Sequence, residues 1–278
     1  MKIGVVGLGI MGSGIAQLSA TSGHDVIVTD VSKAFYDRAV VSMGKSLDKL
    51  IEKKVINQDK GKILSRIVYA DDLKAFSGCD IVIEAVVENQ TAKIEFFKKI
   101  ESIVSPNSII SSNTSSISIT ALGASLKDPS RFLGIHFFNP VALMNLIELI
   151  KGVRTSQQTV NLATEFAKSV GKEYVVVNDS PGFVTTRVIA MLVNEGAFEY
   201  SEGLASKEDI DKALKLGGNF PMGPLTLGDL IGWDTVVNIM DIMYDSYKDP
   251  KFRAAPILRK MVEAGKLGRK SGEGFYKY

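Results

Sequence analysis

His136 and Glu148 are the residues whose types and spacing best suit proton transfer. His136 lies in an apolar run at 131–137, where an imidazole needs a hydrogen-bond partner. Glu148 lies in a second apolar run at 145–150. If the two runs form a hairpin centred on Ala142, these side chains face each other, because they are equally distant from that centre. A carboxylate that orients an imidazole favours general-base chemistry, although a buried histidine with a structural role fits the local sequence equally well.

A hydroxyl-rich segment follows the apolar run at 108–111 that predicts a strand. It reads Ser111-Ser112-Asn113-Thr114-Ser115-Ser116. In open α/β sheets the carboxyl ends of the strands line the ligand crevice, so hydroxyl groups there can hold substrate oxygens. A polar turn that caps a helix is the alternative, because serine and threonine are favoured at helix starts.

Glycines at 7, 9 and 12 match the G-x-G-x-x-G pattern of dinucleotide-binding turns. The pattern is weak alone, but here it follows a predicted strand at 2–6 and opens a predicted helix at 10–20. Such glycines permit a tight turn and close approach of the backbone to a pyrophosphate at the helix start. Asp30 closes the next strand, where a carboxylate can bind ribose hydroxyls and repel a 2′-phosphate, so we expect NAD rather than NADP. The turn residues expected to contact NAD are Gly7, Gly9, Ile10, Met11 and Gly12.

The order of the predicted elements indicates a parallel sheet with helical crossovers. Strand-like runs alternate with helical segments, and they lie at 2–6, 25–29, 67–69, 80–84 and 108–111. The charged segment 33–66 reads as one long helix and one short helix, joined near 56–58. After the hairpin, a helix is predicted at 157–170 and a strand at 174–177.

Beyond Pro181 and Gly182 only helical patterns follow, at 183–203, 206–216, 225–231, 233–247 and 257–264. The fold class is therefore α/β, followed by an all-α region. We predict a Rossmann-type N-terminal domain over residues 1–179, with a helical insertion after its second strand. An all-α C-terminal domain for substrate binding and dimerisation is predicted over residues 180–278.

The composition argues against several classes of protein. The 33 basic and 31 acidic side chains give a formal net charge of +2, unlike the strongly basic domains that bind nucleic acid. No apolar stretch approaches the roughly 18 residues needed to span a bilayer, and no secretory signal is visible, so we expect a soluble cytoplasmic protein. The single cysteine, Cys79, excludes an intrachain disulfide and multi-cysteine metal sites, and is expected in the core. His24, in a Gly-His-Asp turn, is expected at the surface.

Several longer motifs, taken in order over essentially the whole chain, resemble one enzyme family. They are GLGIMGSGIA at 7–16, IVIEAVVE at 81–88, SSNTSS at 111–116, GIHFFNPVALMNLIELI at 134–150, DSPGFV at 179–184, NFPMGPLTLGDLIGWD at 219–234 and LGRKSGEGFY at 267–276. Together they are similar to the motifs of the L-3-hydroxyacyl-CoA dehydrogenases.

The resemblance implies reversible, NAD-dependent oxidation of an L-3-hydroxyacyl-CoA to the 3-oxoacyl-CoA. It implies a catalytic base at His136, its acidic partner at Glu148 and a substrate-contacting serine at Ser115. The NAD contacts that it implies beyond the glycine turn are Asp30, Glu88, Lys93, Asn113, Ser115, Asn139 and Lys270. Those that it suggests for CoA are Ser46, Lys49 and Lys53. The resemblance also implies a homodimer formed through the C-terminal domain.

One position departs from the family pattern. The family reads Gly-Phe-Val-x-Asn-Arg where this chain reads Gly-Phe-Val-Thr-Thr-Arg at 182–187, so Thr186 replaces an asparagine that completes the family's active site. A hydroxyl can still donate one hydrogen bond, but it is shorter than an amide and lacks the second donor. We expect retained activity with an altered rate or substrate fit.

Other interpretations keep the glycine turn and change the chemistry. The 3-hydroxyisobutyrate and 6-phosphogluconate dehydrogenases have a similar turn but use a lysine on the helix that links their domains, and the segment 182–203 has no lysine. L-gulonate dehydrogenase is more closely related and stays open as an alternative. A non-catalytic NAD-binding protein is disfavoured by Ser115, His136 and Glu148, and only Thr186 favours it.

Overall fold

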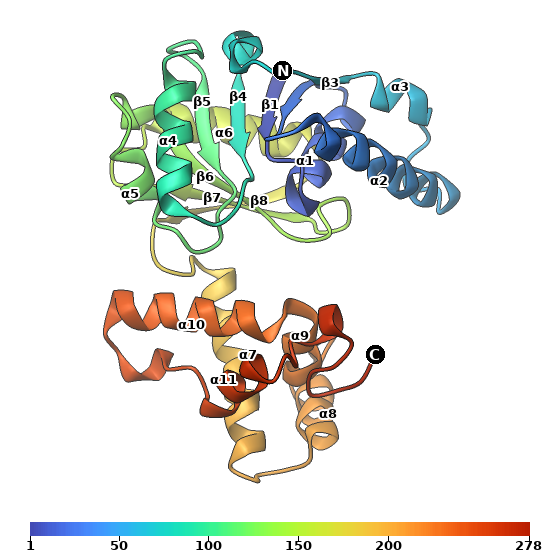
Figure 1. The fold of residues 1–278 in the computed structure, drawn as a ribbon, viewed down its shortest axis with the longest axis vertical. Helices are drawn as coiled ribbons and strands as arrows, with labels where there is room; N and C mark the ends of the chain where they lie inside the picture. The colour runs from blue at the N-terminus through green and yellow to red at the C-terminus, as the bar shows by residue number, and fades with distance from the viewer. The chain divides into compact units, whose positions relative to one another are not determined.

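The computed structural model describes every residue from Met1 to Tyr278, and the chain divides into two compact units (Figure 1). Unit 1 is Met1–Asp179 and unit 2 is Ser180–Tyr278. Each unit encloses its own cluster of buried apolar side chains. Each therefore has the anatomy of a separate domain.

Unit 1 is built on one eight-stranded sheet, and its strands are β1 (Lys2–Val6), β2 (Asp25–Thr29), β3 (Ile67–Tyr69), β4 (Ile81–Glu84), β5 (Ile109–Ser112), β6 (Phe132–Phe137), β7 (Leu146–Lys151) and β8 (Glu173–Asn178). Their order across the sheet is β3-β2-β1-β4-β5-β6-β7-β8. The strands from β3 to β6 run parallel, whereas β7 is antiparallel to β6 and parallel to β8. The chain crosses over beside β1, which is where open α/β sheets bind ligands.

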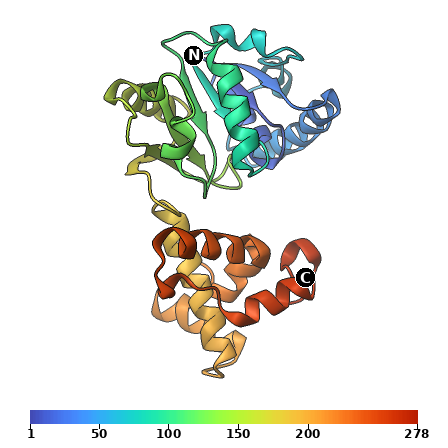
Figure 2. The same ribbon diagram turned by 60° about the vertical axis from the view of Figure 1, so that its left-hand side comes forward.

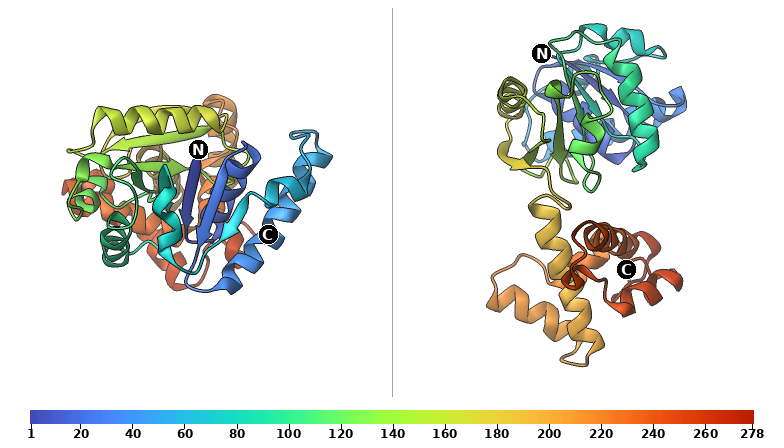
Figure 3. Two further views of the ribbon diagram at one scale, coloured as in Figure 1. Left: turned by 90° about the horizontal axis from the view of Figure 1, so that it is seen from above. Right: turned by 90° about the vertical axis from the view of Figure 1, so that its left-hand side faces the viewer.

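Helices cover both faces of this sheet; Figure 3 shows α6 and α4 on opposite sides. Because side chains alternate along a strand, Leu133 joins the core with α1, α2 and α6, while Phe132 faces the other way and packs 4.9 Å from Phe97 of α4. The helices are α1 (Ile10–Thr21), α2 (Lys33–Glu52), α3 (Lys60–Leu64), α4 (Gln90–Glu101), α5 (Ile119–Gly123) and α6 (Gln157–Ser169), with 3-10 turns η1 (Leu73–Gly78) and η2 (Pro129–Arg131).

The segment predicted as one long and one short helix forms α2 and α3, so that prediction is confirmed. Ser32 caps α2 by accepting a hydrogen bond from the Ala34 N–H at 3.3 Å. The buried residues of α2 recur at helical spacing, which explains why this charged segment packs one face against α1, α3 and β2: Ala39, Met43, Leu47 and Leu50.

The predicted hairpin is also confirmed, with β6 and β7 as its strands. Cys79 lies in the core as expected, 2% exposed, and burial raises the pKa of its thiol to about 11. The surface position expected for His24 is wrong, since this residue is only 8% exposed. Its Nε2 lies 2.8 Å from the Ser169 hydroxyl and its ring packs near Phe166, so the end of α6 covers a turn that local sequence places in solvent.

Unit 2 is built from the helices α7 (Thr185–Ser201), α8 (Lys207–Gly217), α9 (Pro224–Ile231), α10 (Trp233–Tyr247) and α11 (Pro256–Glu263), with 3-10 turns η3 (Pro250–Phe252) and η4 (Arg269–Ser271). Figure 2 shows the long helix α7 with the other helices of this unit around it. Buried Asp229 accepts hydrogen bonds from the Trp233 indole at 2.5 Å and from the backbone of Phe275 and Tyr276 at 2.9 Å. These bonds fasten the end of the chain to α9. In neither unit is any helix long and apolar enough to cross a membrane.

Candidate active site

The parallel strands end along one edge of the sheet, and the register sets their last residues in a row. Val6 of β1 lies beside Glu84 of β4, Glu84 beside Ser112 of β5, and Ser112 beside Gly134 of β6. His136 is the next residue on the same face of β6. Side chains that are far apart in the sequence therefore meet at this edge.

The loop from β1 to α1 has the geometry of a phosphate-binding turn. Gly7 has a φ of 91°, and a Cβ on Gly12 would lie 1.7 Å from the Gly7 carbonyl oxygen, so both positions require glycine. A Cβ on Gly9 would meet nothing within 4 Å, which leaves open space beside the backbone. No side chain caps α1, so its first N–H groups and the positive end of its dipole can receive an anion. Ile10 is 77% exposed beside them, and Met11 is half-buried.

Asp30 follows β2 and lies against the same turn. Its Oδ2 accepts a hydrogen bond from the Leu8 N–H and its Oδ1 accepts one from the Val31 N–H, both at 2.6 Å. These bonds hold the carboxylate beside the glycine turn. Each oxygen retains a second lone pair, so the carboxylate can also accept hydrogen bonds from the hydroxyls of a ribose.

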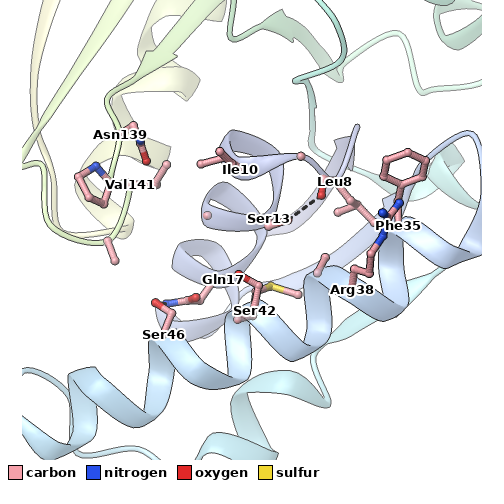
Figure 4. Close-up of a pocket in the computed structure, with 16 residues that line it drawn as sticks. Leu8, Ile10, Ser13, Gln17, Phe35, Arg38, Ser42, Ser46, Asn139 and Val141 are labelled. Carbon is pink, nitrogen blue, oxygen red and sulfur yellow. Dashed lines mark hydrogen bonds between the residues drawn. The ribbon is translucent and has the colours of Figure 1, made fainter. Parts of the chain in front are cut away.

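A cavity of about 490 Å³ opens beside the turn, between α1, α2 and the loop after β6 (Figure 4). Ile10 and Gln17 line it from α1, and Arg38 and Ser46 line it from α2. The Gln17 side chain donates a hydrogen bond to the Ser46 hydroxyl at 3.0 Å, which closes one wall. Asn139 lies across the cavity from these helices. The remaining wall is mostly apolar.

His136 and Glu148 form a buried, hydrogen-bonded pair. Nδ1 of His136 lies 2.9 Å from Oε2 of Glu148, and the two residues are 6% and 0% exposed. The antiparallel register of β6 and β7 pairs these two residues directly, as the sequence predicts. The ring of Phe138 lies 4.6 Å from the imidazole ring. A carboxylate in this position fixes the orientation of the imidazole and stabilises an imidazolium if one forms.

A second polar cluster lies beneath the loop that follows β5, with Glu84 and Lys93 buried and Glu88 at its partly exposed edge. Nζ of Lys93 lies 2.6 Å from Oε1 of Glu84 and 3.2 Å from Oε2 of Glu88, and Lys93 is 1% exposed. Oε1 of Glu88 also accepts hydrogen bonds from the hydroxyls of Thr114 and Ser116. Burial alone would raise the pKa of Glu88, but the Lys93 ammonium and these hydrogen bonds outweigh it, so the pKa lies below its usual value.

Comparison with known proteins assigns both units to one family. The model of the NAD binding domain of 3-hydroxyacyl-CoA dehydrogenase matches residues 2–180, and the model of that family's C-terminal domain matches residues 182–278. The chain belongs to the 3-hydroxyacyl-CoA dehydrogenase family. The resemblance inferred from the motifs is thus confirmed.

Relatives within this family are similar over their whole length. The chain is 50% identical to a probable 3-hydroxybutyryl-CoA dehydrogenase of Deinococcus radiodurans, and the match covers 100% of both chains. It is 44% identical to a 3-hydroxybutyryl-CoA dehydrogenase of Bradyrhizobium diazoefficiens, covering 100% of this chain and 95% of that one. The crystal structure of (S)-3-hydroxybutyryl-CoA dehydrogenase from Ralstonia eutropha is 46% identical, covers 100% of this chain and 98% of its own, and superposes with a TM-score of 0.96.

Several residues that the family resemblance singled out gather at the edge of the sheet, and others do not. Asn113 lies in the loop after β5, where its Oδ1 accepts a hydrogen bond from the Phe137 N–H at 2.9 Å, and Ser115 in the same loop is half-buried. Lys49 and Lys53 are exposed on α2 and at its end, and neither lines the cavity. The ammonium of Lys93 contacts the carboxylates of Glu84 and Glu88. A contact between Lys93 and NAD stays a prediction.

Thr186 and Lys270 belong to unit 2. Thr186 is half-buried in the first turn of α7. Nζ of Lys270 contacts Asp234 at 2.5 Å on a surface of this unit. Their contributions to a family active site stay predictions.

Sequence reasoning missed the partners that hold the site together. Glu84 ends a strongly apolar strand, and a carboxylate at that position indicates a buried charge that needs a partner. Arg38 and Ser42 of α2 line the cavity and precede Ser46 at helical spacing, which was a signal for one shared face. No group of three or more histidine, cysteine, aspartate or glutamate side chains is arranged to hold a metal ion.

Proposed function

We propose that this protein catalyses the reversible, NAD-dependent oxidation of a short-chain L-3-hydroxyacyl-CoA, 3-hydroxybutyryl-CoA, to the 3-oxoacyl-CoA. The single observation that carries the proposal is the buried pair of His136 and Glu148, at the same sheet edge as an uncapped glycine turn. Relatives named 3-hydroxybutyryl-CoA dehydrogenase, at 44–50% identity over the full chain, support the choice of substrate.

The glycine turn and Asp30 fit the nicotinamide dinucleotide that the family uses. The open space beside Gly9 and the free N–H groups of α1 suit a pyrophosphate, and the fixed Asp30 carboxylate suits an adenosine ribose. When NAD is bound it accepts a hydride from the substrate carbon. The chain's own residues must therefore handle the proton and hold the substrate.

His136 is the proposed general acid and base. Because Nδ1 lies against Glu148, Nε2 is the nitrogen assigned to exchange a proton with the 3-hydroxyl group. During oxidation the imidazole takes the hydroxyl proton, and the buried carboxylate stabilises the resulting charge. During reduction the imidazolium returns this proton to the 3-oxo oxygen. Since oxidation releases a proton to solvent overall, higher pH favours that direction.

Ser115 is proposed to donate a hydrogen bond to the reacting oxygen. It lies in a loop whose neighbours Thr114 and Ser116 turn toward Glu88, while Ser115 itself stays partly exposed. Thr186 is proposed to stand in for the family asparagine with one donor instead of two.

The cavity beside α2 is proposed to receive part of the CoA moiety. Ser46 lines it, and Lys49 and Lys53 follow at three- and seven-residue spacing, the first within α2 and the second directly after it. Arg38 is the basic side chain at the lining itself, and a guanidinium is well matched to phosphate.

Two properties of the molecule complete the proposal. Exposed apolar side chains of unit 2 support a homodimer formed through this unit, among them Val188 (64% exposed), Leu204 (71%) and Leu216 (75%). Light scattering of the purified protein would measure its mass.

A cytoplasmic location is proposed because the only cysteine, Cys79, is buried and makes no disulfide.

The decisive experiment compares the wild-type protein with His136→Ala in NADH oxidation by acetoacetyl-CoA. Loss of a general acid lowers kcat by about 10² or more. His24→Asn is the matched control, because it removes the other histidine, which contacts Ser169 and not Glu148. Retention of more than about a tenth of the wild-type kcat in His136→Ala would contradict the proposal. Absence of activity in the wild-type protein with NADH and acetoacetyl-CoA would favour a non-catalytic or differently selective protein.

A further inference from the structure

Glu84 is a fully buried carboxylate that the proposed reaction does not use. It ends β4, is 0% exposed, and makes three short contacts. Oε1 accepts hydrogen bonds from Nζ of Lys93 at 2.6 Å and from the Val86 N–H at 2.7 Å, and Oε2 accepts one from the Ser112 hydroxyl at 2.6 Å. These contacts join the end of β4 to α4, to the loop that follows β4 and to the last residue of β5.

These contacts converge on the loop that carries Ser115. The Ser112 hydroxyl, which donates to Glu84, also accepts a hydrogen bond from the Thr114 N–H at 3.2 Å. The backbone N–H of Asn113 donates to the Glu84 carbonyl oxygen at 2.8 Å. The first half of the loop is therefore tied to Glu84 through both its side chain and its backbone.

Lys93 extends the same connection to the second half of the loop. Its ammonium bridges Glu84 and Glu88, and Glu88 accepts hydrogen bonds from the Thr114 and Ser116 hydroxyls. The two residues on either side of Ser115 are thus fixed, and Ser115 is left with its side chain free to turn elsewhere. The loop is also linked to the acid–base pair, because Asn113 accepts a hydrogen bond from the backbone of Phe137, the neighbour of His136.

The cost of this arrangement argues for a role beyond stability. Removing the Glu84 carboxylate and the Lys93 ammonium from water is expensive, and an apolar replacement of a buried ion pair is often neutral or stabilising. A fully satisfied buried network does, however, hold its members in one geometry. Catalysis needs such geometry, because a displacement of about 1 Å can cost about 10²-fold in rate.

We propose that Glu84 is a positioning residue, which acts through Ser112, Lys93 and Glu88 to hold the Ser115 hydroxyl in register with His136. This inference rests on the proposed function, in which Ser115 contacts the reacting oxygen. Glu84 itself touches neither substrate nor cofactor in this scheme.

The test is a double-mutant cycle between Glu84→Gln and Ser115→Ala, measured by NADH oxidation with acetoacetyl-CoA. Glutamine keeps the shape of Glu84 but cannot accept hydrogen bonds at both ends, so kcat is expected to fall about tenfold or more while KM for NADH stays within about twofold. In the Ser115→Ala background the same substitution is expected to cost less than about twofold, because the group that it positions is already gone.

A second pair of variants keeps the test valid if Glu84→Gln fails to fold. Ser112→Ala removes one hydroxyl that links Glu84 to the loop and is expected to lower kcat in the same direction. Ser111→Ala is its matched control, because Ser111 is equally buried in β5 but donates to the Val82 carbonyl oxygen outside the network.

Four results would overturn the inference. Three are an equal loss from Glu84→Gln with and without Ser115, an effect confined to KM for NADH, and equal kcat values for Ser112→Ala and Ser111→Ala. The fourth is an unchanged kcat in Ser115→Ala alone, because there is then no hydroxyl to position. A large loss in His136→Ala would then still support the proposed function, so the two failures are distinguishable.

Discussion

Replacing Glu148 with glutamine removes one charge from the pair that orients His136 and leaves the shape of the side chain intact. The carboxylate is fully buried, so the packing around it is preserved, but its charged contact with Nδ1 at 2.9 Å is lost. The amide can present either its oxygen or its NH₂ group to the imidazole. In the second arrangement the ring proton moves to Nε2, where it blocks the base that oxidation requires.

The expected loss follows from that single contact. A hydrogen bond to a charged group contributes about 1.5–3 kcal/mol, and about 1.4 kcal/mol corresponds to a tenfold change in rate. We therefore expect kcat of Glu148→Gln to fall by about 10- to 150-fold in both directions. Reduction uses the imidazolium as its proton donor, and this cation loses its counter-charge in the variant. The pH optimum of reduction should therefore move to lower pH.

The assay is steady-state oxidation of NADH by acetoacetyl-CoA over a series of pH values. KM for NADH should not change, because the pair lies on β6 and β7 and not in the glycine turn. Glu101→Gln is the matched control, since Glu101 is also a nearly buried glutamate, with 8% of its side chain exposed, but it contacts Arg131 at the end of α4. A Glu148→Gln enzyme that is folded and retains wild-type kcat and pH optimum would refute the reasoning.

Three further changes test the cofactor turn and the buried network. Gly9→Ala adds a Cβ where the chain leaves open space, so the free energy of unfolding should stay within about 0.5 kcal/mol while NADH binds about tenfold more weakly, measured by chemical denaturation and by titration of NADH fluorescence. Asp30→Asn removes the charge that repels a 2′-phosphate, so the ratio of activities with NADPH and NADH should rise, measured with saturating acetoacetyl-CoA. Glu88 has a lowered pKa when folded, so its carboxylate stabilises the protein above its unfolded pKa of 4.5, and this contribution is lost as pH falls through the lower folded value. Glu88→Gln should therefore flatten the acid limb of stability against pH, measured by denaturation at each pH.

Each of these predictions has a clear opposite result. A Gly9→Ala protein that binds NADH normally would show that no ligand approaches this backbone. An unchanged preference for NADH in Asp30→Asn would place the ribose elsewhere. An identical acid limb in Glu88→Gln would mean that the Lys93 contact does not stabilise the carboxylate.

The sheet and the catalytic pair could be predicted because local patterns determine them. Strands at 2–6 and 25–29 are short apolar runs bounded by turns, and the structure assigns the same residues to β1 and β2. The hairpin prediction succeeded because two apolar runs flank one turn, which fixes the register of His136 against Glu148. Within a hairpin, the distance of each residue from the turn is enough to predict which residues face each other.

The rest of the site depends on contacts between distant segments. Nothing near His24 in the sequence indicates that the end of α6 covers it, since Ser169 lies 145 residues later in the chain and Phe166 is close to Ser169. The role of Lys93 is equally hidden, because an amphipathic helix with several lysines gives no sign of which one is buried. The strand order that brings Glu84 beside Ser112 likewise follows from the topology of the sheet, not from either segment alone.

The two fully buried glutamates, Glu84 and Glu148, both provide hydrogen-bond partners for buried polar groups at one edge of the sheet. Parallel strands bring backbone ends and polar side chains together there, and each buried polar group needs a partner. Glu148 satisfies the imidazole of His136, and Glu84 satisfies Lys93 and the Ser112 hydroxyl. Neither carboxylate is required by the apolar core, which lies within the sheet and its helices. Neutralising either one removes a charged partner from a buried group, so stability should fall along with turnover, and a loss of stability with no change in kcat would show that these glutamates serve the fold alone.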